Sequence, residues 1–69
     1  MQTTMKSTAV KSMARDAVHA LEHYQLNHPG SRTAQLVKVR GMLSFMDALQ
    51  NSATVTISQD DYVALTQLP

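Results

Sequence analysis

A short run in the first third of the chain has the residue types and spacing of a metal site. His19, Glu22 and His23 lie in the sequence HALEH, which matches the pattern H-x-x-E-H. Two histidines four residues apart share one face of a helix and can bind the same metal ion, and a glutamate beside them could activate a bound water. The chemistry that this pattern would support is metal-assisted hydrolysis.

The rest of the chain does not supply what this chemistry needs. Zinc takes a third protein ligand, normally from a separate segment, and His28 is the only other histidine. The motif resembles that of the inverted zinc proteases, but that family is far larger than 69 residues and needs a substrate cleft. We therefore interpret HALEH as part of a solvated helix face, and we expect no enzymatic activity, no bound metal and no cofactor.

HALEH belongs to a helix that we predict at about residues 5–27. Apolar residues recur in it every three or four positions, at Val10, Met13, Ala17, Leu21 and Tyr24. Thr3, Thr4 or Ser7 can cap its start, and we expect residues 1–4 to be frayed.

A short loop, residues 28–31, separates this helix from a second one at about residues 32–51. Pro29 and Gly30 end the first helix, and Ser31 is expected to cap the second. A connection this short predicts an antiparallel helical hairpin.

The second helix is the most strongly patterned part of the chain. Its apolar residues form two adjacent rows that are expected to merge into one broad face: Leu36, Val39, Met42, Leu43, Phe45, Met46 and Leu49. Polar residues occupy the other side: Gln35, Lys38, Arg40, Ser44 and Asp47. A two-helix hairpin can bury one row only, so the other needs the C-terminal helix or another chain. We predict that these seven apolar residues form a protein interface and that two hairpins pair into a dimeric helical bundle.

Gly41 interrupts this helix and allows two interpretations. It is either a tolerated surface glycine, which we favour, or the site of a close helix–helix crossing.

The C-terminal part changes pattern. The segment ATVTIS, residues 53–58, alternates and is rich in β-branched residues, so it reads as extended. It is either a linker at residues 52–58, which we favour, or half of a strand pair between two protomers. Ser58 and Asp61 then resemble a capping box that opens a short helix at residues 59–67.

Length and charge limit the remaining function classes. Sixty-nine residues make one small domain, which is mainly α, and small domains are commonly stabilised by oligomerisation. No apolar run is long enough to span a bilayer, and residues 1–16 lack the apolar segment of a secretory signal, so we expect a cytoplasmic protein.

The charges are unevenly distributed along the chain. Residues 1–40 hold all six basic side chains and two acidic ones, whereas residues 41–69 hold three acidic side chains. Such asymmetry can orient a partner or favour antiparallel self-association. Five basic residues are candidates for contact with nucleic-acid phosphates: Lys11, Arg15, Arg32, Lys38 and Arg40.

Several segments together resemble a group of small phage proteins. A basic helix, an NHPG turn, the run GMLSFMDALQ and the closing TVTISQDDYVALTQL are similar in size and layout to accessory proteins of temperate lambda-type phage early regions. The resemblance implies a non-enzymatic protein of a bacterial host cytoplasm that self-associates and perturbs host or phage regulation. We therefore expect an interaction or regulatory protein that acts as a homodimer on another protein. The alternative is a small DNA-binding regulator that uses the basic half.

Overall fold

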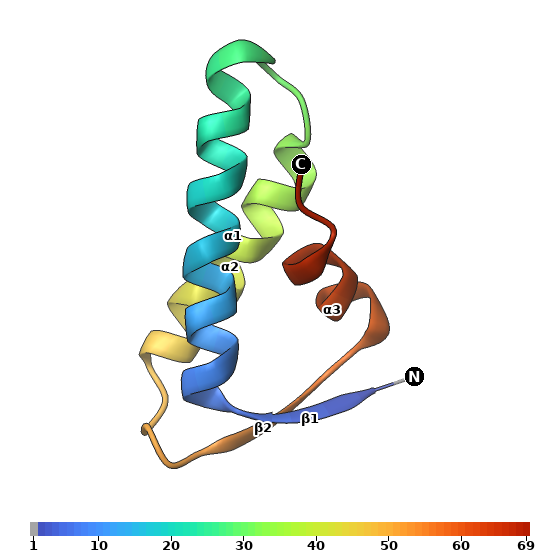
Figure 1. Ribbon diagram of the computed structural model, residues 1–69. Coiled ribbons are helices and arrows are strands. Elements are labelled where there is room, and N and C mark those ends of the chain that lie inside the picture. The colour runs from blue at the N-terminus through green and yellow to red at the C-terminus, as the bar shows by residue number, and fades with distance from the viewer. Residues whose placement is uncertain (1) are drawn as a thin grey trace.

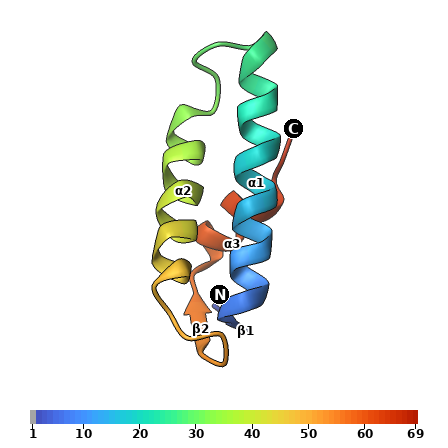
Figure 2. The same ribbon diagram turned by 90° about the vertical axis from the view of Figure 1, so that its left-hand side faces the viewer.

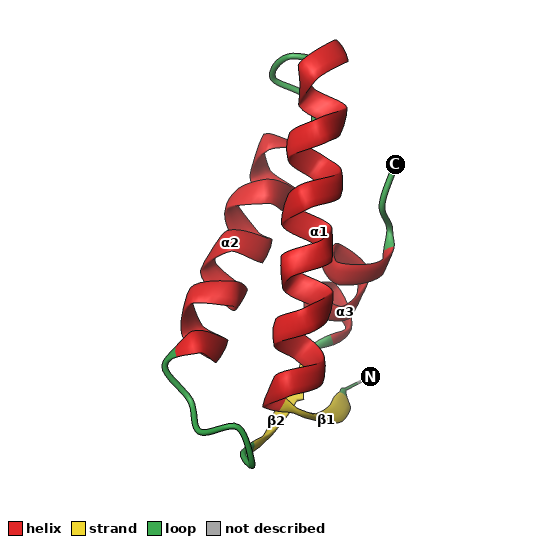
Figure 3. Ribbon diagram, turned by 60° about the vertical axis from the view of Figure 1, so that its left-hand side comes forward, coloured by secondary structure: helices red, strands yellow, loops and turns green. Residues whose placement is uncertain are grey.

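The computed structural model describes residues 2–69, which form three helices and a two-stranded antiparallel sheet (Figure 1). In chain order the elements are β1 (Thr3–Lys6), α1 (Ser7–Asn27), α2 (Thr33–Asp47), β2 (Thr54–Ile57) and α3 (Gln59–Thr66). The long helices α1 and α2 lie side by side, and the sheet lies at the end where α1 begins (Figures 1 and 3). The predictions of a mainly helical fold and of a helical hairpin are confirmed.

The core forms where one face of α1 meets the other elements. Val10, Ala14, Ala17 and Leu21 recur at three- and four-residue spacing on α1 and are fully buried. The two alanines present no side chain beyond Cβ, so neighbouring elements can approach α1 closely. The buried apolar residues of the other elements complete the core: Leu36, Val39, Met46, Ile57, Ala64 and Leu65.

The strand pair corrects two sequence predictions. Thr3 and Thr4 are not frayed, and residues 54–57 are not a linker, because β1 and β2 pair in a register that sets Thr3 opposite Ile57. Met1 lies outside the described residues. Alternation sends one set of side chains toward the helices, where Ile57 is buried and Met5 and Val55 pack against the core. Pairing thus buries these side chains while satisfying the backbone, and β2 finds its strand partner within the same protomer.

Ser7 joins the sheet to the first helix and is the buried polar residue of the core, with 2% of its surface exposed. Its N–H donates to Ala53 O at 2.8 Å, and its Oγ donates to Gln50 O at 2.9 Å. Because residues 3–6 are extended and paired with β2, α1 begins at Ser7 rather than at about residue 5. Its N-cap residue is Lys6, and no side chain from Thr3, Thr4 or Ser7 caps it.

The turn between α1 and α2 also differs from the prediction. Ser31 does not cap α2, which begins at Thr33 after Arg32 in a left-handed conformation at φ 58°. Gly30, two residues before Arg32, is also left-handed, at φ 79°. Between them, Ser31 O accepts a hydrogen bond from Gln25 Nε2 at 2.7 Å. Two left-handed residues complete the chain reversal, so the first helical residue falls later than expected.

The end of α2 also differs: the helix stops at Asp47 instead of residue 51. The chain must turn here to bring β2 alongside β1. Ala53 N–H donates to Gln50 O at 3.0 Å within that turn.

Helix α3 closes the open side of the hairpin and packs against α1 and α2. The predicted cap is confirmed, because Ser58 Oγ accepts a hydrogen bond from Asp61 N–H at 3.2 Å. Gln35 Nε2 of α2 donates to Ala64 O at 2.9 Å and ties the two helices together. No helix within residues 2–69 has both the length and the hydrophobicity needed to cross a bilayer.

The two glycines offer a matched test of this backbone. Gly30→Ala is expected to lower the free energy of unfolding by about 1 kcal/mol, because alanine is strained at positive φ. Gly41→Ala is expected to raise it by about 0.5–1 kcal/mol, because the position is helical and an added Cβ would meet no atom within 4 Å. Chemical denaturation of both variants measures the two effects, and a loss at Gly41 would contradict the helix described here.

Candidate protein-interaction site

The seven residues predicted to form an interface have different surroundings in the structure. Leu36, Val39 and Met46 are buried, with 3%, 0% and 6% of their surfaces exposed. Met42, Leu43 and Leu49 are partly buried against the same core. Phe45 is 59% exposed. Most of the predicted set therefore builds the protomer's own core, and Phe45 alone among them is open to solvent.

A second apolar face of α2, which sequence reasoning missed, surrounds Phe45. We call it the outer α2 face, and all its members are exposed: Ala34, Val37, Gly41, Phe45 and Ala48. Val37 is 61% exposed, comparable to Phe45. The expectation of a polar opposite side of α2 is therefore wrong, because this exposed apolar face lies opposite the buried row. Spacings of three and four between its members were the signal in the sequence.

Gly41 lies in the middle of the outer α2 face. No atom of the protomer lies within 4 Å of where its Cβ would be. Gly41 is thus a surface glycine, as favoured, and no helix of this protomer crosses there.

Phe45 and Gly41 also border a groove of about 340 Å³ between α2 and β2, the α2–β2 groove. Its remaining walls come from three elements: Lys38, Met42, Met46, Val55, Thr56, Ile57 and Asp61. Figure 2 shows α2 and β2 on the same side of the molecule, with α1 and β1 on the other. The lining is apolar apart from Thr56 and the ion pair in which Lys38 Nζ lies 3.2 Å from Asp61 Oδ1.

A second groove, of about 440 Å³, lies between α2 and α3. Ala34, Val63 and Ala64 line its apolar part, and Lys38 borders both grooves. Val63 is 36% exposed. The apolar surface of α2 thus continues onto α3.

The outer edge of β2 adds unpaired backbone groups to this side of the molecule. The bond from Ser7 N–H to Ala53 O makes this residue pair a hydrogen-bonded one. Hydrogen-bonded and non-bonded pairs alternate in an antiparallel ladder, so Val55 bonds to Met5, whereas Thr54 and Thr56 face away from β1. The N–H and C=O groups of Thr54 and Thr56 therefore point outward at the edge of β2.

The basic residues proposed for nucleic-acid contact are mostly engaged within the chain. Lys11 pairs with Asp47 at 2.8 Å, Arg40 with Glu22 at 2.7 Å, and Lys38 with Asp61 as described above. All three ion pairs link different helices.

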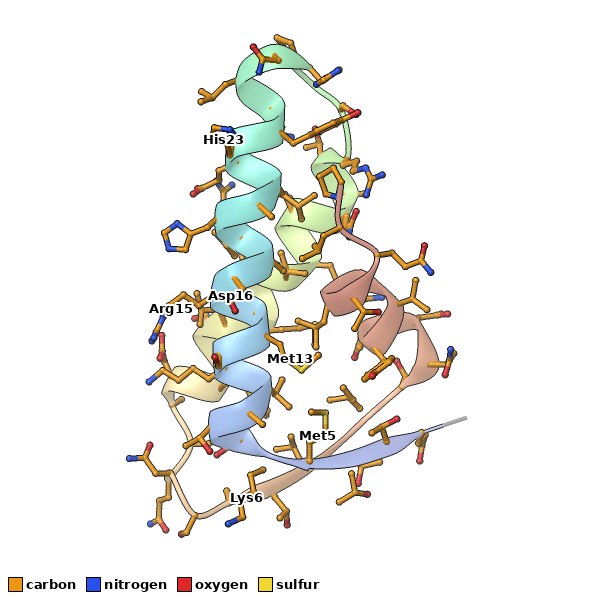
Figure 4. The ribbon with its side chains drawn as sticks, viewed as in Figure 1. Met5, Lys6, Met13, Arg15, Asp16 and His23 are labelled. Carbon is orange, nitrogen blue, oxygen red and sulfur yellow. The ribbon has the colours of Figure 1, made fainter. Side chains whose placement is uncertain are left out.

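The other cations are dispersed. The Arg32 guanidinium donates to Gln67 O at 2.9 Å and lies over the Tyr24 ring at 5.5 Å. Figure 4 shows Arg15 on the outer side of α1 and Lys6 pointing away from the helices below the sheet. The structure does not gather the five candidate residues into one basic patch.

The HALEH side chains His19, Glu22 and His23 all lie on the exposed surface of α1. Glu22 pairs with Arg40. The His28 ring stacks on Tyr24 with centroids 4.1 Å apart. Across residues 2–69 no three histidine, cysteine or acidic side chains are grouped so that they could hold a metal ion.

Comparisons with protein-family models, curated proteins and solved structures find no match to this chain. The site is therefore described by its own chemistry: an exposed apolar helix face, two adjoining grooves and an open strand edge.

Neighbouring residues of α2 test the distinction between its two faces. Phe45→Ala is expected to lower the free energy of unfolding by less than about 1 kcal/mol, because the ring is mostly exposed, whereas Met46→Ala should cost about 2–5 kcal/mol. Urea denaturation at low protein concentration measures both. A larger loss at Phe45 than at Met46 would place the aromatic ring inside the core.

Nucleic-acid binding is expected to be absent. In a titration with duplex DNA at about 0.15 M salt, the dissociation constant should be weaker than about 10⁻⁴ M, because the internal ion pairs and the scatter of the cations prevent a concentrated positive field. Fluorescence anisotropy of labelled DNA measures this. Tight binding that weakens steeply with salt would contradict it.

Proposed function

We propose that this chain is a non-enzymatic interaction protein that acts as a homo-oligomer on another protein. The observation that carries the proposal is the outer α2 face, where Val37 and Phe45 are 61% and 59% exposed on either side of Gly41. Exposed apolar residues that cluster, rather than occur singly, are typical of interaction sites.

Shape and charge support a protein as the partner. The outer α2 face adjoins two grooves, and the one between α2 and α3 has about 440 Å³, a volume that can accept side chains of a bound protein. The charged residues that line the two grooves, Arg32 and Lys38 against Asp60 and Asp61, sum to zero. A surface with little net charge favours apolar contact over binding to a polyanion.

In the proposed role, self-association covers the outer α2 face, and the α2–α3 groove serves the second protein. This role fits a regulatory accessory protein of a bacterial host or a temperate phage, as the sequence resemblance implies, and the second protein would then be a host or phage protein.

Sedimentation equilibrium from low micromolar to millimolar concentration tests self-association. The wild-type chain is expected to reach twice the mass of one chain at the upper end, and Phe45→Ser is expected to remain monomeric, because it replaces the largest exposed side chain of the outer α2 face with a polar one.

Leu26→Ser provides the matched control. Leu26 is 74% exposed but lies near the end of α1, outside the outer α2 face. Its loss should leave association unchanged. A folded wild-type monomer at every concentration, or equal weakening by the two substitutions, would overturn the proposal.

A further inference from the structure

The outer edge of β2 carries backbone hydrogen-bonding groups that have no partner within the fold. Strand β2 bonds to β1 on one side only, and the outward N–H and C=O groups of Thr54 and Thr56 form its other side. This edge lies beside the α2–β2 groove, because Val55, Thr56 and Ile57 line that groove together with Gly41 and Phe45. A strand bound there would contact backbone donors and an apolar helix face at once.

The two open edges of the sheet are protected differently. Natural proteins commonly block exposed strand edges with lysine or proline. Strand β1 carries Lys6, whereas β2 has the sequence TVTI, with no charge and no proline. The edge of β2 is therefore the one suited to pairing.

On the basis that the chain self-associates as proposed above, we propose that the outer edge of β2 binds the β2 strand of a second copy of this chain. Two β2 strands pair antiparallel about a two-fold axis and form a four-stranded sheet, β1–β2–β2–β1. Thr54 of each copy forms a hydrogen-bonded pair with Thr56 of the other. Val55 then lies opposite Val55 in a non-bonded pair, where side chains come closest.

A second copy fits this edge because the arrangement is self-complementary. Antiparallel pairing sets the donors and acceptors of one Thr54 against those of the other copy's Thr56. No charge lies on the strand, and Lys38 and Asp61 beside it neutralise each other at 3.2 Å, so two copies meet without net repulsion.

Interface area requires more than the strand. A stable dimer buries about 800 Å² on each partner, roughly a fifth of the 4424 Å² surface of this chain. An edge of four residues is too small to supply this alone. Phe45, which lines the groove beside the edge, supplies further apolar area, and Val37 extends the outer α2 face beyond it. The absence of a side chain at Gly41 leaves space for the facing copy.

A proline at each of the two open edges tests the assignment. Thr56→Pro removes an N–H that points away from β1, so the internal ladder remains intact while the proposed dimer loses two hydrogen bonds. We expect the dimer dissociation constant to rise at least about tenfold.

Thr4→Pro is the matched control. Thr4 lies opposite Thr56 in the ladder, it is also exposed, and its N–H also points outward, but from β1. The Oγ1 atoms of the two threonines lie 3.3 Å apart, so each substitution removes the same side-chain contact. Thr4→Pro should change the dissociation constant by less than about twofold.

Amide hydrogen exchange of the wild-type chain gives a test that does not depend on a variant folding. The amides of Thr54 and Thr56 should exchange rapidly at low concentration and become protected as the concentration rises, whereas the Val55 amide, which faces β1, should be protected throughout.

The outcomes separate the edge assignment from self-association itself. A dimer in which Thr54 and Thr56 remain unprotected, or which Thr56→Pro leaves unchanged, would overturn pairing through β2 and leave self-association through the outer α2 face in place. A monomer at every concentration would overturn both and would leave the edge to an extended segment of another protein.

Discussion

Two hydrogen bonds made by Ser7 fix the junction at which the sheet, the start of α1 and the turn after α2 meet. Its N–H bonds to Ala53 O and its Oγ to Gln50 O, so one buried residue fixes the start of α1 against the turn that follows α2. The same N–H sets the alternation of the β1–β2 ladder. Which backbone groups of β2 bond to β1, and which face outward, follows from this one contact.

The shape of the molecule explains why its core cannot cover α2 on both sides. The Cα atoms extend over 37 × 24 × 14 Å, and a helix with its side chains is about 10 Å across. A body this thin has little more than one layer of helices behind any surface. Helices α1 and α3 pack against α2, and nothing within residues 2–69 packs against Phe45 and Val37 on its outer side.

The sequence was sufficient for the features that depend on local spacing. The apolar period of α1 located its core face, and Ser58 with Asp61 located the start of α3, because helix periodicity and capping act over a few residues. The strand pair was missed because Thr3 and Ile57 are far apart in the chain and nothing in four residues of TTMK specifies a partner. The extended character of residues 54–57 was visible, but its partner was not.

The same limit explains the error in the candidate interface. Periodicity shows which residues of α2 share a side, but it does not show which side meets α1. Assigning the predicted apolar face to an interface included Leu36 and Val39, which are buried in the core, and left out Val37, which is exposed on the other side of α2. Only the packing of α1 and α3 separates the two sides.

The exposed outer α2 face and the free edge of β2 have one geometric cause. Because β2 follows α2 through a short turn, its free edge emerges beneath the helix that the core leaves half covered, and Phe45 and Thr56 line the same groove. A short isolated two-stranded sheet is marginal in water, and here packing of Met5, Val55 and Ile57 on the core stabilises it. A further strand at β2 would extend the ladder and contact the part of the outer α2 face formed by Gly41 and Phe45. An additional helix on α2 alone would leave the backbone groups of Thr54 and Thr56 unpaired at the rim of the contact. Pairing through the strand therefore satisfies both features, and this is why strand-mediated contact is favoured over a purely helical bundle.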